Sequence, residues 1–203
     1  MLEIQTKQSH WRRNLSIFFA VILFGIGMYV LITALTPGLD VPALTGKVPH
    51  DTEKKLEKKP GSYGNRLYIP QINVDVAVVT GSDSSVLEKG AWHRRPENGD
   101  PEKGGNFVLS AHRFVMSFTP QGTTLKSPFY NIDKLNVGDP LFVDYNGKRY
   151  QYDITKKYAV APSASEIEAK TEVSKLTLYS CTLEGSSDGR DVIEAIPHVQ
   201  QDV

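Results

Sequence analysis

The chain has 203 residues, enough for one ordinary domain with a buried core and an additional segment. Hydrophobic residues make up 40% of it and charged residues 23%, which is a globular composition. The formal net charge is zero, so the chain has neither the basic excess typical of nucleic-acid binding nor an acidic disordered tail.

An uncharged apolar run occupies residues 15–35. A helix of this length spans about 30 Å, the thickness of a bilayer's hydrocarbon core, and this run has no polar face. Arg12 and Arg13 precede it, which places the N-terminus on the cytoplasmic side. The alternative, a cleaved signal peptide, would have a shorter apolar region ending in an A-x-A pattern. We therefore expect a cytoplasmic segment 1–14, a single-pass transmembrane anchor 15–35 in the cell membrane, and an extracytoplasmic remainder.

Residues 36–61 differ in composition from the anchor before them and the domain after them. Prolines and glycines are frequent, and the charged stretch DTEKKLEKK contains few large apolar side chains. Such a segment cannot bury a core of its own, so it predicts a solvated extracytoplasmic stalk.

Residues 62–203 carry a series of short apolar and β-branched runs. Asn146-Gly147 lies between two of them and is a strong signal for a two-residue hairpin. Helical periodicity is scarce, and residues 82–91, 127–135 and 163–171 could each form a short helix or a turn. Several short strands at this spacing predict an all-β barrel or sandwich.

Cys181 is the only cysteine, so it cannot form a disulfide within the chain. One interpretation is a small buried hydrophobic residue. On a strand ending at this position, however, Leu176 and Leu178 share one face and Cys181 lies on the other. Because the leucine face is the expected core face, Cys181 should point away from the core at a strand end, where a nucleophile would be accessible.

A cysteine nucleophile needs a proton partner and a group that stabilises negative charge. Three of the five histidines lie outside the central part of the domain, in the cytoplasmic segment, the stalk and the C-terminal tail: His10, His50 and His198. His93 falls in a loop rich in proline, glycine and charge, and His112 ends the apolar strand GNFVLSAH. Spacing alone does not decide between them.

Arg190 is nine residues beyond Cys181 and begins another strand-like run, RDVIEAI. A short loop between the strands would bring Arg190 back near the cysteine, where a permanently charged guanidinium suits a substrate carbonyl or an oxyanion. The other interpretation is a structural ion pair with Asp188 or Asp191, and the sequence leaves both open.

At these residues the chain resembles the sortase family, the membrane-anchored cysteine transpeptidases of mainly Gram-positive bacteria. TLYSC (residues 177–181) is similar to the family's T-L-x-T-C strand end, with Ser180 where threonine is usual. GNFVLSAHR (105–113) is similar to the segment of the catalytic histidine, LNVGDPLFV (135–143) to a family strand entry, and Arg190 matches the family arginine. The resemblance covers about residues 64–197.

The resemblance implies a closed β-barrel of about eight strands with short helices as the catalytic domain, residues 62–203. It assigns Cys181 as nucleophile, His112 as proton carrier and Arg190 as the oxyanion partner, and it implies no metal or organic cofactor. The implied partners are the membrane, through the N-terminal helix, a surface protein or pilin with an LPxTG-like signal cleaved between Thr and Gly, and an amine acceptor such as a lipid-linked peptidoglycan precursor or a pilin lysine. A hydrolase using the same residues and a non-catalytic membrane-tethered binding domain remain the alternatives.

Overall fold

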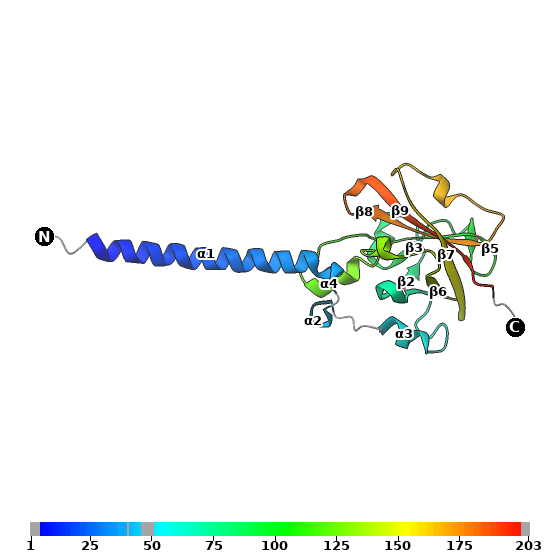
Figure 1. The fold of residues 1–203 in the computed structure, drawn as a ribbon, viewed down its shortest axis with the longest axis horizontal. Helices are drawn as coiled ribbons and strands as arrows, with labels where there is room; N and C mark the ends of the chain where they lie inside the picture. The colour runs from blue at the N-terminus through cyan, green and yellow to red at the C-terminus, as the bar shows by residue number, and fades with distance from the viewer. Residues whose placement is uncertain (1–4, 40, 46–50, 200–203) are drawn as a thin grey trace.

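The computed structural model describes residues 5–39, 41–45 and 51–199 and contains one long helix followed by a β-rich domain (Figure 1). The α-helices are α1 (Gln5–Leu35), α2 (Pro42–Thr45), α3 (Asp51–Leu56) and α4 (Pro120–Lys126). Single 3-10 turns lie at Thr36–Gly38, Pro70–Ile72, Ser84–Glu88, Ile132–Lys134 and Glu166–Glu168. The strands are β1 (Arg66–Ile69), β2 (Val74–Val79), β3 (Ala91–His93), β4 (Gly99–Asp100), β5 (Gly104–Ser110), β6 (Pro140–Tyr145), β7 (Lys148–Val160), β8 (Lys175–Thr182) and β9 (Gly185–Pro197).

The strands form a closed barrel. In the described part of the chain, eight of them are paired in the order β3-β2-β1-β6-β7-β9-β8-β5, and a further pairing of β3 with β5 closes the ring. Strand β4 forms a hairpin with the start of β5. Two pairings, β2 with β3 and β5 with β8, are parallel, and the others are antiparallel. The expectation of an all-β closed barrel of about eight strands with short helices and a preceding apolar helix is thus confirmed.

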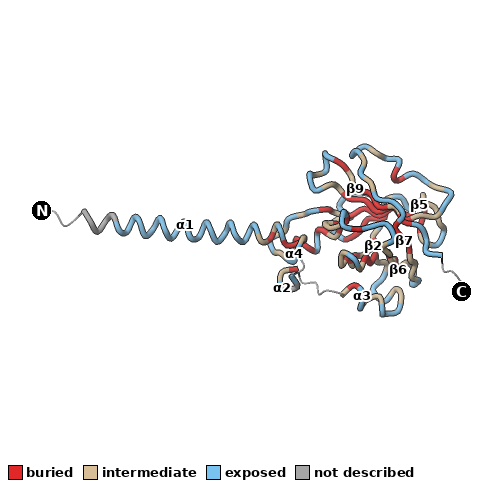
Figure 2. The backbone as a smooth tube through the Cα atoms, viewed as in Figure 1, coloured by how far each residue is buried: buried red, intermediate tan, exposed pale blue. Residues whose placement is uncertain are grey.

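The barrel interior is the main apolar core, as Figure 2 shows by the buried colour of the strands. Leu67, Leu109, Leu141 and Leu178 are among the side chains that are fully buried there. A second, smaller cluster covers the opposite face of β5, β8 and β9 with Val108, Ile167, Tyr179 and Val192. Strand β8 is therefore buried on both faces for most of its length, whereas the sequence indicated a single core face.

The local turn signals are confirmed. Asn146 and Gly147 both adopt left-handed backbone conformations, with φ of 49° and 80°, between the paired residues Tyr145 and Lys148. These are the angles that a two-residue hairpin turn requires and that asparagine and glycine tolerate best. Each of the three polar segments expected to form a short helix or a turn contains one 3-10 turn.

Helix α1 is long and apolar enough to cross a bilayer, and its residues are exposed along most of its length (Figure 2). Its C-terminal end packs on α4 of the barrel domain. Described parts of the expected stalk also touch the domain: Asn131 donates a hydrogen bond to the carbonyl of Pro37, and Arg149 donates one to the carbonyl of Leu56. These parts lie against the barrel instead of being fully solvated, and His50 lies outside the described residues.

Candidate active site

The antiparallel pairing of β8 with β9 places Cys181, near the end of β8, directly opposite Arg190. The pairing shifts by a bulge after Cys181 and ends at Thr182 and Gly185, where a φ of 117° turns the chain. Residues 185–189, expected to form a loop, are instead the first part of β9. The turn is tighter than the sequence indicated because glycine at position 185 adopts a backbone angle that other residues rarely reach.

The end of β5 lies beside the end of β8. Ser110 is paired with Tyr179, and the amide of Ala111 donates to the Tyr179 carbonyl at 3.4 Å. The hydroxyl of Ser180 donates to the Ala111 carbonyl at 2.8 Å. Ala111 directly precedes His112, and Ser180 directly precedes Cys181. The hydrogen bond between Ala111 and Ser180 therefore brings His112 and Cys181 to the same rim of the barrel. The hydroxyl that serine shares with threonine is used in this contact.

The imidazole of His112 is half-buried and faces a carboxylate. Its Nε2 lies 3.5 Å from Oε1 of Glu88, whose other oxygen accepts a hydrogen bond from Lys126 of α4 at 2.8 Å. The hydrogen bond and charge of Lys126 hold the pKa of Glu88 below its usual range. Sequence reasoning did not identify Glu88, because it lies in a polar turn with no motif of its own.

Arg190 is held by backbone carbonyls of its own strand, β9. Its Nη1 donates to the carbonyls of Ser186 and Gly189, both at 2.8 Å. The two carboxylates considered as structural partners are engaged elsewhere in the described structure: Asp188 accepts from Thr182, and Asp191 pairs with Arg113. Backbone carbonyls thus position the guanidinium. Because carbonyls carry no net charge, these contacts do not neutralise the positive charge of Arg190.

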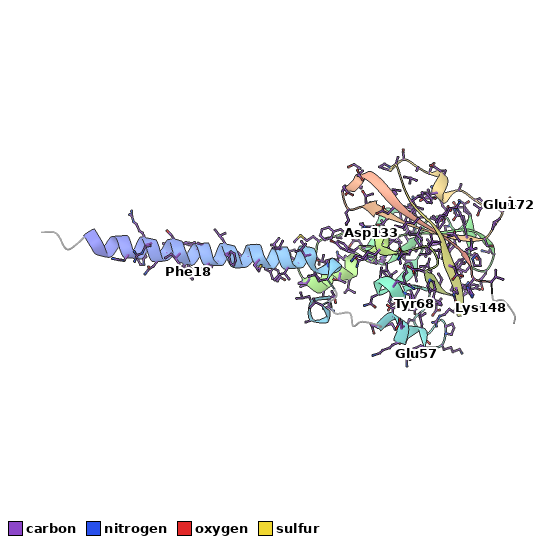
Figure 3. All side chains as sticks on the ribbon, in the orientation of Figure 1. Phe18, Glu57, Tyr68, Asp133, Lys148 and Glu172 are labelled. Atoms are coloured by element: carbon purple, nitrogen blue, oxygen red, sulfur yellow. The ribbon has the colours of Figure 1, made fainter. Side chains whose placement is uncertain are left out.

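Arg113, the neighbour of His112, is a buried cation that sequence reasoning also missed. Its side chain is only 3% exposed and donates to Asp191 at 2.9 Å and to Asp133 at 2.7 Å. Asp133, labelled in Figure 3, lies on the 3-10 turn before β6. Burial raises the pKa of Asp191, and the Arg113 charge opposes that shift. Arg113 therefore ties the segment after His112 to the residue after Arg190.

His93 lies in strand β3, not in the loop that the sequence indicated, and is almost completely buried. Its Nε2 lies 3.0 Å from the Gly99 carbonyl, and its ring packs edge-on against Phe107 at 4.7 Å between centroids. Burial lowers the pKa of His93, which keeps the ring neutral. His10 contacts Arg13 and His198 pairs with Asp153, so of the four histidines described only His112 lies at the rim with Cys181.

A buried carboxylate secures the outer face of β8 just before the cysteine. Glu168 accepts hydrogen bonds from Arg94 at 2.8 Å, from Arg95 at 2.9 Å and from the hydroxyl of Tyr179. Burial alone would raise the pKa of Glu168, but these donors outweigh it and hold that pKa below its usual range. Burial, together with the bond to Glu168, raises the pKa of Tyr179 to about 12. The contacts hold the long β7–β8 connection against the strand that carries Cys181.

A thiol, an imidazole and a guanidinium thus occupy one rim of the barrel: Cys181 lies near the end of β8, Arg190 lies opposite it in β9, and His112 follows the end of β5. Cys181 is half-buried and belongs to neither apolar cluster. This combination of nucleophile, proton carrier and fixed cation is suited to acyl transfer through a covalent intermediate.

Comparison with known proteins assigns the barrel domain to a family. The family model described as the sortase domain matches residues 67–198. Sortase SrtE1 of Streptomyces coelicolor is 30% identical over 151 residues, which cover 66% of this chain and 40% of that protein. Sortase D of Bacillus subtilis is 30% identical over 132 residues, covering 64% of this chain and 60% of that protein. The chain thus spans less than two thirds of the length of either relative.

Solved structures give the same result for the fold. A Clostridium perfringens Sortase D5 transpeptidase superimposes with a TM-score of 0.55 and 26% identity, covering 74% of this chain and 88% of that one. Sortase A of Corynebacterium diphtheriae, as a lid mutant, superimposes with a TM-score of 0.57 and 20% identity, covering 68% and 71% of the two chains. The second similarity concerns the fold alone.

Proposed function

The chain belongs to the sortase family, and from that premise we propose that it is a membrane-anchored cysteine transpeptidase. It cleaves an LPxTG-like sorting signal between Thr and Gly and joins the acyl product to an amine. Cys181 is the nucleophile, His112 the proton carrier and Arg190 the group that stabilises the oxyanion. The observation that carries this proposal is the register pairing of Cys181 with Arg190, beside a β5 end that is hydrogen-bonded to β8 one residue before His112.

The proposed reaction has two half-reactions. In the first, the Cys181 thiolate attacks the threonine carbonyl carbon, and Arg190 donates hydrogen bonds to the oxygen that becomes negative. The C–N bond then breaks, the departing glycine amine takes a proton from His112, and a thioester remains on Cys181. In the second, an acceptor amine attacks the thioester and gives a proton to His112. The C–S bond breaks, and the thiolate is restored.

We place this reaction at the outer surface of the cell membrane. Residues 1–14 are cytoplasmic, residues 15–35 cross the bilayer, residues 36–61 connect the anchor to the barrel, and residues 62–203 form the catalytic domain. The β8–β9 turn, drawn in orange in Figure 1, lies on the side of the barrel from which α1 extends. A site on that side is close to a lipid-linked peptidoglycan precursor, while a surface protein or pilin supplies the sorting signal.

The test uses the full chain in detergent micelles with LPxTG-type and LAxTG-type peptides and a glycine or lysine amine. Products and adducts are read by mass spectrometry. We expect a ligated product and a thioacyl adduct on Cys181, and we expect Cys181→Ala to abolish both while the domain remains folded. Ser187→Ala, an exposed change in the first part of β9, serves as the matched control and should retain activity.

Other products would change the assignment. Cleavage without ligation for every amine tested would indicate a hydrolase that uses the same residues. Normal turnover by Cys181→Ala would eliminate the cysteine mechanism. If no adduct forms on any peptide and alkylation of Cys181 leaves function untouched, the domain is a binding module.

A further inference from the structure

The segment that follows His112 exposes a row of large apolar side chains. Phe114, Met116 and Phe118 are exposed, Phe118 to 95%, and Leu125 of α4, which follows within seven residues of the chain, is exposed as well. We refer to these four residues as the apolar row. Other exposed apolar residues of the barrel, such as Val137 and Val173, occur singly, which is ordinary for a soluble surface.

Hydrogen bonds to the domain fix the direction of the row. The amide of Val115 donates to the hydroxyl of Ser127 at 2.9 Å, and the amide of Ser117 donates to the hydroxyl of Thr123 at 3.0 Å. Exposure alternates along this segment: positions 114, 116 and 118 are exposed, whereas Val115 and Ser117, whose amides are bonded to the domain, are partly buried. The exposure of the row is therefore a property of an ordered segment.

The row lies beside the end of α1. The hydroxyl of Tyr29 donates to the carbonyl of Phe118 at 2.7 Å. The ring of Phe114 lies 6.0 Å from that of Tyr130, which in turn packs against Gly38 just after α1. Helix α4 itself packs on α1, as Figure 1 shows. The row thus continues the exposed apolar surface of the helix onto the barrel domain.

The depth of this contact follows from helix geometry. Tyr29 precedes Leu35, the last residue of the apolar helix, by six positions, or about 9 Å along the axis at 1.5 Å per residue. The Phe118 carbonyl is bonded at the level of Tyr29, so the acyl chains end near Tyr29 and the last six residues of the helix, 30–35, lie in the interfacial part of the bilayer. Tyrosine is enriched at that level, where an aromatic ring meets the head groups. Irregular backbone is not tolerated among acyl chains, so the row belongs in the interfacial layer.

We propose that the apolar row docks on the lipid surface and inserts its side chains into the interfacial layer of the membrane that α1 crosses. This inference rests on the membrane anchoring in the proposed function. Continuity with α1 selects lipid as the occupant, because any membrane that surrounds the last turns of α1 also reaches Phe118. The barrel is then held by two contacts, a spanning helix and a surface-bound segment.

Docking would also affect the candidate site. Phe114 follows His112 by two residues, and Lys126 at the end of α4 reaches the same Glu88 carboxylate that faces His112. A bilayer that holds this segment therefore holds the backbone next to the imidazole. The rim carrying Cys181 then opens close to the lipid head groups, where a lipid-linked acceptor would be presented.

The test places an environment-sensitive fluorophore on one cysteine at a time in the full chain, with Cys181 replaced by serine, in nanodiscs. The label sites are Phe118→Cys in the row, Leu23→Cys in the middle of α1 and Val173→Cys on a distant loop. Phe118 and Val173 are both exposed and apolar, which makes them a matched pair. Val173 follows Glu172, which Figure 3 labels at the end of the barrel away from α1.

We expect blue-shifted emission at positions 118 and 23 and water-like emission at 173. Nitroxide lipids labelled near the head group should quench position 118 most, and those labelled deep in the acyl chain should quench position 23 most. If position 23 is quenched while the emission and quenching at position 118 are the same as at position 173, α1 crosses the membrane but the row does not bind it, and the proposal is wrong. A blue shift at 118 without lipid quenching would assign the row to a protein contact and also overturn it. Absence of quenching at position 23 would refute the anchoring on which both ideas depend, while the peptide ligation assay would still test catalysis.

Discussion

Replacing Arg113 with methionine tests whether one buried cation holds together the rim that carries the candidate site. Arg113 connects the segment after His112 to Asp191, the neighbour of Arg190, and to Asp133. Methionine keeps an unbranched apolar stem but removes the guanidinium and with it both ion pairs. We expect a less stable domain in which the ends of β5 and β9 are no longer tied to each other.

The expected loss of unfolding free energy in Arg113→Met depends on how exposed the two partner carboxylates are. The Asp133 carboxylate is half exposed, so its pair with Arg113 is worth only about 0–1 kcal/mol. Asp191 is more buried, and its charge-assisted hydrogen bond contributes about 1.5–2 kcal/mol. The Nε of Arg113 is buried without a partner among the described residues, and removing it recovers part of the loss. We therefore expect the free energy of unfolding to fall by about 2 kcal/mol.

A double-mutant cycle isolates the contact with Asp191. In Arg113→Met, the half-buried Asp191 carboxylate lacks the cation that it pairs with. Adding Asp191→Asn to this variant should therefore make it more stable, with a coupling energy between the two positions of about 1–2 kcal/mol. The assay is urea unfolding of the full chain in detergent micelles, followed by the emission of Trp92, which is buried in the barrel. A change below about 0.5 kcal/mol for Arg113→Met, or a double variant no more stable than the single one, would refute this reasoning.

Three further predictions concern charge at the site and in the core. Arg190→Lys should lower kcat severely in the ligation assay while the domain stays folded, because lysine lacks the planar fork of donors; unchanged kinetics would give Arg190 a structural role. Since burial lowers the pKa of His93, the unfolded state takes up its proton at a higher pH than the folded state does. The free energy of unfolding should therefore drop by up to about 1.4 kcal/mol per pH unit below about pH 6.5, and His93→Gln should reduce that slope. Glu168→Gln should cost about 2 kcal/mol at neutral pH in urea unfolding. The lowered pKa of Glu168 means that the wild-type advantage disappears as the pH falls through that folded-state value, and a constant difference down to acid pH would contradict it.

Short-range patterns in the chain were sufficient for the secondary structure and for the main site candidates. Alternating apolar residues predicted most strands, and the left-handed tolerance of Asn146 and Gly147 predicted their hairpin. The apolar run predicted α1, and the motifs around Cys181 and His112 predicted the family. These inferences succeed because the relevant energies, namely backbone preference, side-chain periodicity and transfer from water, act between residues that are close in sequence.

Contacts between distant segments could not be predicted in this way. The closure of the barrel by β3 and β5 depends on the whole strand order, and His93 proved to be part of that closure instead of a loop. Glu88 lies beside His112 only because a turn 24 positions earlier folds back onto the end of β5. Neither residue lies in a motif that marks its role.

The sequence by itself determined the class of protein: an apolar helix followed by an all-β domain with a cysteine, a histidine and an arginine in sortase-like contexts. Only the tertiary structure decided that Arg113 is buried between two aspartates and that Tyr29 of the helix bonds to Phe118 of the barrel. The physical reason is that burial and ion pairing depend on which surfaces meet after the strands have paired. Residues 78 and 89 positions apart in the chain carry no local signal that they will become neighbours.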